Sequence, residues 1–325
     1  MAQPFPSPGI GVGTWSWGNR FLWGYDTAQD EELKTCFERA VALGLRFFDT
    51  ADSYGTGRFN GRSEELLGSF CGSLPEKARG ELTVATKLAP FPWRLGRDGY
   101  RRAFEASRRR LRGKLDRVQL HWSTARYASW QERPLLDGLA DLVLQGEVAE
   151  LGVSNLGPRR LRQVHRQLAE RGVRLSSLQV QLSLLAPQVL APGGVAEVCR
   201  ELGIELIAYS PLALGLLARS PGENDAPLPR GPRGLLFRRL LPRVQPLLEC
   251  MGRIAEPHGA SIAAVALNWC RSHGAMPIPG LRRAFQVEDA KACLAWRLEP
   301  AEREELDVLA LACPLRMPAN PFQSA

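Results

Sequence analysis

Short apolar runs alternate with longer amphipathic stretches along most of the chain. Runs rich in Val, Ile, Leu and Phe are typical of buried strands, whereas apolar residues spaced three and four apart are typical of helices that pack on one face. The pattern predicts strands at residues 10–14, 45–48, 82–85, 118–120, 148–153, 178–180, 204–208 and 276–278. It predicts helices at residues 27–43, 63–70, 100–111, 134–145, 158–170 and 195–202.

Several helix boundaries carry signals of their own. Ser63 is followed by two acidic residues, which favours a helix start, and Pro158 is typical of the first turn of another helix. Gly44, Gly172 and Gly203 stand where three predicted helices end and the chain turns back.

Eight strands separated by helices fit a closed parallel barrel better than an open sheet. We therefore predict an α/β fold, a single (β/α)8 TIM barrel with long mouth loops and a C-terminal helix, in one domain over residues 1–325. Residues 211–242 lack clear periodicity and are rich in Pro, Gly and Arg, so we expect an excursion over the barrel mouth that acts as a lid. A linker between two domains would have the same composition, but the alternation of strands and helices is the same before and after this segment. Residues 300–311 predict the closing helix, and residues 313–325 a tail.

The composition is that of an ordinary globular protein, with 45% apolar and 23% charged residues. No run approaches the roughly 18 to 20 apolar residues of a membrane helix, and the first residues lack the pattern of a secretion signal. We expect no membrane association and a cytoplasmic location. The seven cysteines are scattered, which favours reduced, buried thiols over a disulfide framework. Cys270 and His273 lie three apart, but no second pair with zinc spacing follows, so we predict no metal site.

A formal net charge of +8 raises the possibility of a nucleic-acid partner, above all through the arginine run at residues 108–110. The same predicted helix carries Phe104 and Leu111 on its inner stripe, so its arginines fit a solvated face. No basic groove interleaved with aromatic residues accompanies them. We expect no nucleic acid as a partner, and attraction of small anionic molecules instead.

Polar residues end three of the apolar runs, and in an α/β barrel such positions meet at one mouth. Asp49 follows the second predicted strand, Lys87 the third and His121 the fourth, while Tyr54 lies in the loop after Asp49. Taken alone, the Asp fits a helix cap, and the Tyr and His fit packing. Lys87 is the most informative of the four, because the chain is rich in arginine and poor in lysine. Their convergence favours a catalytic group.

The chemistry of carbonyl reduction explains this combination. The developing alkoxide needs a proton donor, and a phenol with an ordinary pKa of about 10 is a poor donor near neutral pH unless a nearby charge stabilises its phenolate. We expect Lys87 to lower the pKa of Tyr54, Asp49 to hold Lys87, and His121 to bond and orient the substrate oxygen. Neither a Ser-His-Asp triad nor the paired carboxylates of a glycosidase has a comparable candidate at the strand ends.

Five blocks of sequence, in order, resemble the aldo-keto reductase family. They are Phe-Phe-Asp-Thr-Ala-Asp-Ser-Tyr-Gly from residue 47, Ala-Thr-Lys from 85, Leu-His-Trp from 120, Leu-Gly-Val-Ser-Asn from 151 and Ile-Ala-Tyr-Ser-Pro-Leu from 207. The resemblance spans nearly the whole chain. Within the family, the segments at 13–18 and 231–237 look most like the cyanobacterial and plastid members, a group related to plant pyridoxal reductase.

The resemblance implies an NADP-dependent oxidoreductase that reduces aldehydes and ketones, with Asp49, Tyr54, Lys87 and His121 as its catalytic residues. It implies that NADPH lies extended across the barrel mouth, without a Rossmann domain. The cofactor-binding residues carried over are Thr14, Trp15, Asp49, Ser154, Asn155, Gln179, Tyr209, Ser210, Pro211, Leu212, Gly215, Leu217, Gly280, Arg282, Gln286 and Asp289. Asp289 and Ala290 depart from the family's Glu and Asn there, which puts the adenine contacts in doubt.

One alternative of another class stays open. The potassium-channel β-subunits share this fold and most of these motifs, so a cofactor-holding regulatory or redox-sensing subunit with incidental turnover is a second reading. The complete catalytic group favours an enzyme. Seven aromatic residues near the predicted mouth favour a planar or apolar carbonyl substrate, of which pyridoxal is one candidate: Trp15, Trp17, Phe21, Trp23, Tyr25, Phe59 and Trp122. We expect a monomer.

Overall fold

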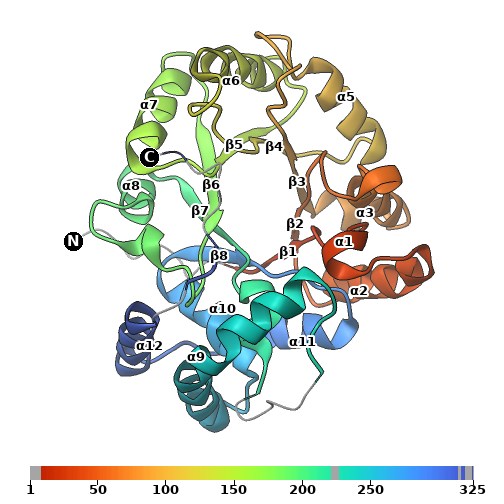
Figure 1. The fold of residues 1–325 in the computed structure, drawn as a ribbon. Helices are drawn as coiled ribbons and strands as arrows, with labels where there is room; N and C mark the ends of the chain where they lie inside the picture. The colour runs from red at the N-terminus through yellow and green to blue at the C-terminus, as the bar shows by residue number, and fades with distance from the viewer. Residues whose placement is uncertain (1–8, 221–226, 314–315, 319–323, 325) are drawn as a thin grey trace.

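A computed structural model describes residues 9–220, 227–313, 316–318 and 324 of the chain. Eight parallel strands pair in chain order around a central axis, with helices outside them (Figure 1). The strands are β1 (Gly11–Gly13), β2 (Phe47–Asp49), β3 (Thr83–Leu88), β4 (Arg117–Leu120), β5 (Glu150–Ser154), β6 (Leu175–Gln181), β7 (Glu205–Tyr209) and β8 (Ala275–Ile278). This is the predicted (β/α)8 architecture, and all eight strands lie within a few residues of their predicted positions.

The barrel closes between its first and last strands at two glycines. Gly13 and Gly280 form a parallel bridge, and the Gly13 amide donates to the Pro279 carbonyl at 2.9 Å. A Cβ atom on Gly13 would stand 2.8 Å from the Ile278 carbonyl oxygen, closer than real contacts allow. Only glycine therefore permits the two backbones to meet here.

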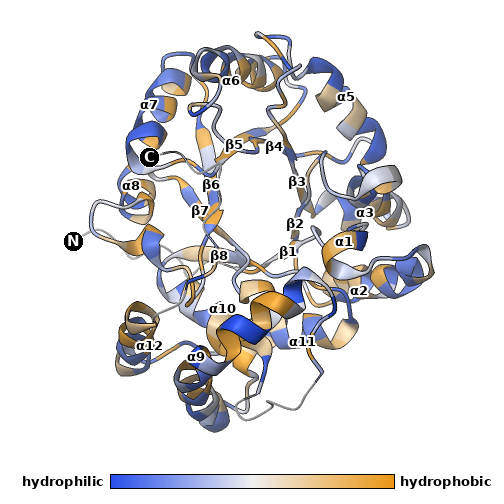
Figure 2. Cartoon of the chain, in the orientation of Figure 1, coloured by the Kyte–Doolittle hydropathy of each residue, from blue (hydrophilic) through white to orange (hydrophobic). Residues whose placement is uncertain are grey.

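Helices surround the barrel and bury their apolar faces against it, as the inward orange and outward blue of Figure 2 show. They are α1 (Arg20–Trp23), α2 (Asp30–Ala42), α3 (Arg62–Gly72), α4 (Glu76–Gly80), α5 (Arg101–Arg110), α6 (Ser129–Leu144), α7 (Pro158–Ala169), α8 (Val195–Leu202), α9 (Pro232–Ala255), α10 (Ile262–Ser272), α11 (Ala284–Ala292) and α12 (Pro300–Ala312). Short 3-10 turns η1 (Thr27–Gln29), η2 (Gly57–Phe59), η3 (Gln188–Leu190), η4 (Ala213–Ala218) and η5 (Glu256–His258) join some of them.

The predicted helix ends at Gly44, Gly172 and Gly203 are confirmed, since each glycine has a positive φ. The predicted excursion at 211–242 is wrong in part. Residues from Pro232 onward form the first turns of α9, and η4 occupies the start of the segment. Pro242 and Pro246 obscured the helical pattern, yet both lie on the exposed face of α9, where water can satisfy the carbonyl groups that proline leaves unpaired. Residues 221–226 of the predicted excursion lie outside the described part.

The interior of the barrel holds two layers of side chains. Residues two apart on a strand point to the same face, so Phe47 lies beneath Asp49, Ala85 beneath Lys87 and Ile207 beneath Tyr209. The lower layer is an apolar cluster that also contains Met276, and the cluster extends upward to Ile278, which pairs with Tyr209. The upper layer is polar and faces the carboxyl ends of the strands, where barrel enzymes place their chemistry.

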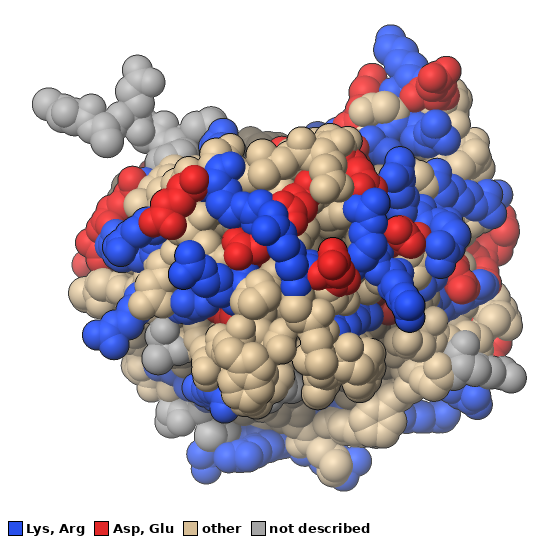
Figure 3. Space-filling model, turned by 90° about the horizontal axis from the view of Figure 1, so that it is seen from above, with Lys and Arg blue, Asp and Glu red and all other residues tan. Residues whose placement is uncertain are grey.

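Several arginines on the outside of the barrel are paired with acidic residues. Arg97 contacts Asp141, and Arg101 bonds Glu147 at 2.5 Å. Figure 3 shows basic and acidic side chains interleaved on the face that it displays. No helix among the described residues is long and apolar enough to cross a membrane, and no cluster of metal-ligand side chains occurs among them. Six cysteines are buried free thiols, and Cys313 is partly exposed.

Candidate active site at the carboxyl end of the barrel

A cavity of about 650 Å³ opens at the carboxyl ends of the strands. All four predicted catalytic residues, Asp49, Tyr54, Lys87 and His121, line it. They come from β2, the loop after it, β3 and the end of β4, so the barrel brings together residues that are far apart in sequence.

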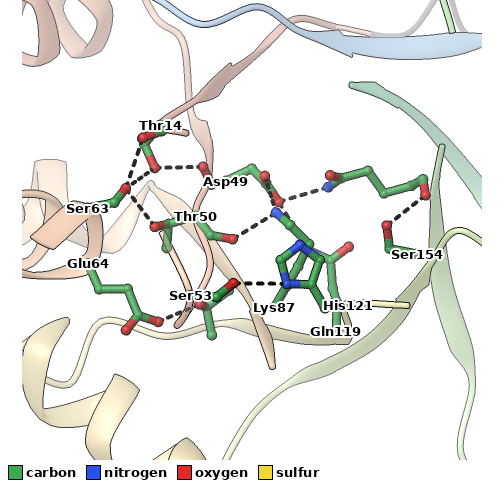
Figure 4. Close-up of polar contacts among 12 residues, drawn as sticks. Thr14, Asp49, Thr50, Ser53, Ser63, Glu64, Lys87, Gln119, His121 and Ser154 are labelled. Carbon is green, nitrogen blue, oxygen red and sulfur yellow. Dashed lines mark hydrogen bonds and ion pairs between the residues drawn. The ribbon is translucent and has the colours of Figure 1, made fainter. Parts of the chain in front are cut away.

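The Asp49 carboxylate is the centre of the buried polar layer. Lys87 Nζ donates to Asp49 Oδ2 at 2.5 Å, and Gln179 and Gln119 donate to Asp49 Oδ1 at 2.8 and 3.1 Å (Figure 4). Lys87 Nζ also donates to the Thr50 carbonyl at 2.8 Å. Lys87 and Asp49 are each 1% exposed, so this is a buried ion pair with additional hydrogen bonds from neighbouring residues.

A group of three hydroxyls, those of Thr14, Thr50 and Ser63, lies beside the Asp49 backbone, and one of them bonds it. Thr14 Oγ1 donates to the Asp49 carbonyl at 2.9 Å, and Ser63 Oγ lies 2.6 Å from Thr14 Oγ1 and 2.9 Å from Thr50 Oγ1. Ser63 was predicted to open a helix, but α3 begins at Arg62 with Gly61 as its N-cap. The Ser63 side chain instead points inward and links α3 to β1 and β2 (Figure 4).

Tyr54 and His121 face each other beside this pair. Their ring centroids are 5.8 Å apart, and Lys87 Nζ lies 4.9 Å from the centroid of the Tyr54 ring. Ser53 Oγ lies 3.3 Å from His121 Nδ1, which fixes the orientation of the imidazole. The arrangement can present one phenol and one imidazole to the same substrate oxygen.

Burial sets the protonation of these groups. It lowers the pKa of His121 well below 6.5, and the charges of Lys87 and Arg94 lower it further, so the imidazole is neutral at physiological pH. Burial also lowers the pKa of Lys87, against the opposing effect of Asp49. The expected decrease of the Tyr54 pKa is wrong for this arrangement, because burial and the Asp49 carboxylate raise it well above 10. The Lys87 charge is already compensated by Asp49, which explains why it does not dominate at Tyr54.

Most residues predicted to bind the cofactor line the same cavity: Trp15, Asp49, Ser154, Asn155, Gln179, Tyr209, Ser210, Pro211, Leu212, Gly215, Gly280 and Gln286. Four others are not among the residues that line it: Thr14, Leu217, Arg282 and Asp289. Thr14 and Leu217 are fully buried in packing. The Arg282 guanidinium donates to the Trp23 carbonyl at 3.1 Å and to Gln29 at 2.8 Å.

Of the aromatic residues predicted near the mouth, some line the cavity and others are buried in packing. Trp15, Trp23 and Trp122 line the cavity, as expected. Trp17 and Tyr25 are instead buried packing residues, with Trp17 donating to the Leu281 carbonyl at 2.9 Å.

Sequence reasoning missed Arg233, which also lines the cavity. It lies in the first turn of α9, and its guanidinium carbon stands 3.9 Å from the centroid of the Trp23 ring. Burial and the nearby charge of Arg282 lower the pKa of Arg233 to about 10. Gly231 and Pro232 just before it are a helix-start signal that could have placed it at a helix N-terminus facing the mouth.

Three buried polar atoms on the cavity wall have no partner among the described residues: Ser16 Oγ, Trp23 Nε1 and Arg233 Nε. Together with the Tyr209 ring and the nearby Arg282 charge, they form a donor-rich, partly aromatic surface. Such a surface suits a long anionic ligand with aromatic rings, as NADPH is.

Comparison with known proteins decides the family. The aldo/keto reductase family model matches residues 9–310. The chain belongs to the aldo/keto reductase family. This aldo/keto reductase is therefore an oxidoreductase, and the fold and family predicted from its sequence are confirmed.

Two relatives illustrate its place in the family. The aldo/keto reductase is 46% identical over 320 residues to the chloroplastic pyridoxal reductase of Arabidopsis thaliana, covering 97% of this chain and 86% of the plant protein. This identity confirms the predicted likeness to plastid members. An uncharacterised oxidoreductase of Mycobacterium tuberculosis is 34% identical over 304 residues, covering 91% of this chain and 87% of the relative.

Solved structures resemble it over almost its whole length. An aldo/keto reductase from Klebsiella pneumoniae in complex with NADP and acetate has a TM-score of 0.71 at 25% identity, covering 98% of this chain and 95% of the other. The glycerol dehydrogenase of Gluconobacter oxydans has a TM-score of 0.77 at 23% identity, covering 100% and 97%, and shows the likeness of fold alone.

Proposed function

We propose that this protein reduces aldehydes and ketones to alcohols with NADPH, with Tyr54 as the proton donor. The observation that carries the proposal is the convergence of Tyr54, His121 and the buried Asp49–Lys87 pair on one cavity. The cofactor found with the Klebsiella pneumoniae relative, NADP, supports the choice of nicotinamide.

NADPH, when bound, supplies a hydride to the carbonyl carbon. The chain's own residues do the rest. Neutral His121 bonds the carbonyl oxygen and orients it, and Tyr54 gives its phenolic proton to that oxygen as negative charge develops there. Its raised pKa keeps Tyr54 protonated until then. Lys87, 4.9 Å from the ring, stabilises the phenolate that forms, and Asp49 keeps Lys87 in position.

Residues at the carboxyl ends of β5, β6 and β7 would hold the cofactor. Ser154, Asn155 and Gln179 offer amide and hydroxyl groups to the carboxamide, and the Tyr209 ring offers a stacking surface. The Tyr209 hydroxyl donates to Asn155 Oδ1 at 2.9 Å, so the ring is fixed before a ligand arrives. Arg233 and Arg282 lie close enough for their charges to interact unfavourably, and a phosphate near them would relieve that repulsion.

We propose a planar aromatic aldehyde as the substrate class, with pyridoxal as the first compound to test. The relative in Arabidopsis thaliana carries that substrate in its name, and Trp15, Trp23 and Trp122 give the cavity aromatic walls. A single domain, a monomeric state, a cytoplasmic location and the absence of nucleic-acid partners stay predictions from the sequence.

The test is a spectroscopic assay of NADPH oxidation by the purified protein with pyridoxal, benzaldehydes and short aliphatic aldehydes. We expect steady turnover that requires the carbonyl compound and disappears in the Tyr54→Phe variant. A protein that binds NADPH tightly but reduces none of these compounds would favour the cofactor-holding regulatory subunit instead.

A further inference from the structure

Arg94, in the loop after β3, contacts the loop after β2 and two residues of its own loop. It donates to Asp52 Oδ2 at 2.5 Å and to the Ala89 carbonyl at 2.6 Å, and its guanidinium carbon lies 4.9 Å from the centroid of the Phe91 ring. The Arg94 side chain is 15% exposed and that of Asp52 is 3% exposed. This enclosed pair differs from the exposed ion pairs on the outer helices, which contribute little.

Asp52 connects the loop that carries Tyr54 to the strand that carries Lys87. It lies two residues before Tyr54, and its backbone amide donates to the Lys87 carbonyl at 3.0 Å. Its Oδ1 atom accepts from the Ala89 amide at 3.2 Å, while its other oxygen accepts from Arg94. One aspartate therefore joins the two segments at three points.

Phe91 continues these contacts toward His121. The Phe91 and Trp122 rings meet edge to face with centroids 6.1 Å apart, and the Trp122 ring lies 4.9 Å from that of His121. The Trp122 ring nitrogen donates to the Tyr127 hydroxyl, which donates to the Pro90 carbonyl, both at 2.9 Å. The loop after β3 is thus bonded to the loops that carry Tyr54 and His121.

We propose that Asp52 and Arg94 are a pair of positioning residues that hold the Tyr54 loop at its working distance from Lys87 and His121. The proposal rests on the proposed function for its catalytic consequence. Neither residue lines the cavity, so the pair acts through Tyr54 and not on a bound molecule. Small displacements of a proton donor lower turnover steeply, whereas the proposed cofactor contacts from β5, β6 and β7 should be unaffected.

Arg94→Met tests the pair, with Arg117→Met as the matched control. Arg117 is equally enclosed, 8% exposed, and bonds Glu150 and Glu205 at 2.5 and 2.6 Å, but at the amino end of the barrel. We expect Arg94→Met to lower kcat by about 10- to 100-fold with little change in the Kd of NADPH. Arg117→Met should lose thermal stability yet keep the kcat of the wild type. Arg94→Lys should recover part of the loss, because an ammonium can still pair with Asp52.

Two further readouts separate positioning from general stability. Removing the Arg94 charge should raise the pKa of His121, so the acid limb of the kcat profile moves to higher pH. The two other influences on the imidazole, the Lys87 charge and the Ser53 contact, stay the same in this variant. Hydrogen exchange should become at least about tenfold faster at the Asp52 and Ala89 amides in Arg94→Met and in Asp52→Asn, and stay unchanged there in Arg117→Met.

The outcomes distinguish the two proposals. A wild type without reductase activity would overturn the proposed function, and the exchange rates at Asp52 and Ala89 would still test the pair. Unchanged exchange at both amides in Arg94→Met, or a kcat equal to that of an active wild type, would overturn the positioning role.

Discussion

Replacing Lys87 with Met removes one half of the buried ion pair and leaves the side-chain volume nearly the same. Asp49 is then left with only the Gln119 and Gln179 amides as partners, at 3.1 and 2.8 Å. The bond from Lys87 to the Thr50 carbonyl is lost as well. The change is therefore mainly electrostatic, and a packing defect contributes little.

The size of the effect follows from burial. Breaking a buried ion pair by removing one partner destabilises a protein by about 3 to 5 kcal/mol. Two amide donors still stabilise the Asp49 carboxylate, so we expect the lower end, about 3 kcal/mol, or roughly a 100-fold change in the folding equilibrium. That is a large part of the 5 to 15 kcal/mol by which most proteins are stable.

Urea unfolding measures the lost free energy of unfolding. The proteins compared are the wild type, Lys87→Met and the double variant Lys87→Met with Asp49→Asn. The double variant removes the unpaired charge and should regain most of the lost free energy of unfolding. It should nevertheless lack reductase activity, because no ammonium remains beside Tyr54. A double variant as unstable as Lys87→Met would refute the electrostatic explanation and point to packing instead.

Three other outcomes follow from the site. Tyr54→Phe should lower turnover by orders of magnitude while the NADPH dissociation constant stays nearly unchanged, and wild-type turnover in this variant would contradict its role as proton donor. Arg282→Ala should weaken NADPH by about tenfold or more and leave NADH unchanged, whereas equal binding of both cofactors by the wild type would speak against a phosphate contact there. The pKa of His121 is well below 6.5 in the folded state, so as the pH falls this imidazole binds a proton in the unfolded chain before it does so in the folded one. The free energy of unfolding therefore decreases from pH 6.5 downward. His121→Asn should show a smaller decrease over this range in urea unfolding, and an equal decrease would remove His121 as its source.

The sequence was sufficient to predict that the four candidate catalytic residues meet at one mouth, because barrel geometry brings them there. A polar residue that ends an apolar strand must lie at the carboxyl end, and parallel strands bring all such ends to one mouth. Asp49, Lys87 and His121 satisfied that rule directly. Tyr54 has no periodic signal of its own, and only its place in the loop five residues after Asp49 put it at the same mouth.

Contacts that depend on long-range packing could not be predicted in the same way. Gln119 lies inside an apolar strand, and only the alternation of β4 around the closed barrel turns it toward Asp49. Arg233 belongs to a helix whose two prolines concealed its periodicity. Arg94 lies in a loop after β3, and its partner Asp52 is fixed by the tertiary structure alone.

The convergence of three strands on the Asp49 carboxylate also fixes the shear of the barrel. Donors from β3, β4 and β6 reach one group on β2, and a slip of one residue in any of these strands would turn its donor to the outer face. The stagger between the strands therefore determines whether the donors reach Asp49. A barrel that closes with the wrong stagger cannot form the buried ion pair. The loops after β2, β3 and β4 are bonded to one another around Tyr54 and His121, but the other loops beyond the strands bear no such constraint. New substrate preferences can arise by exchange of those loops, while the alignment of the strands beneath them stays the same.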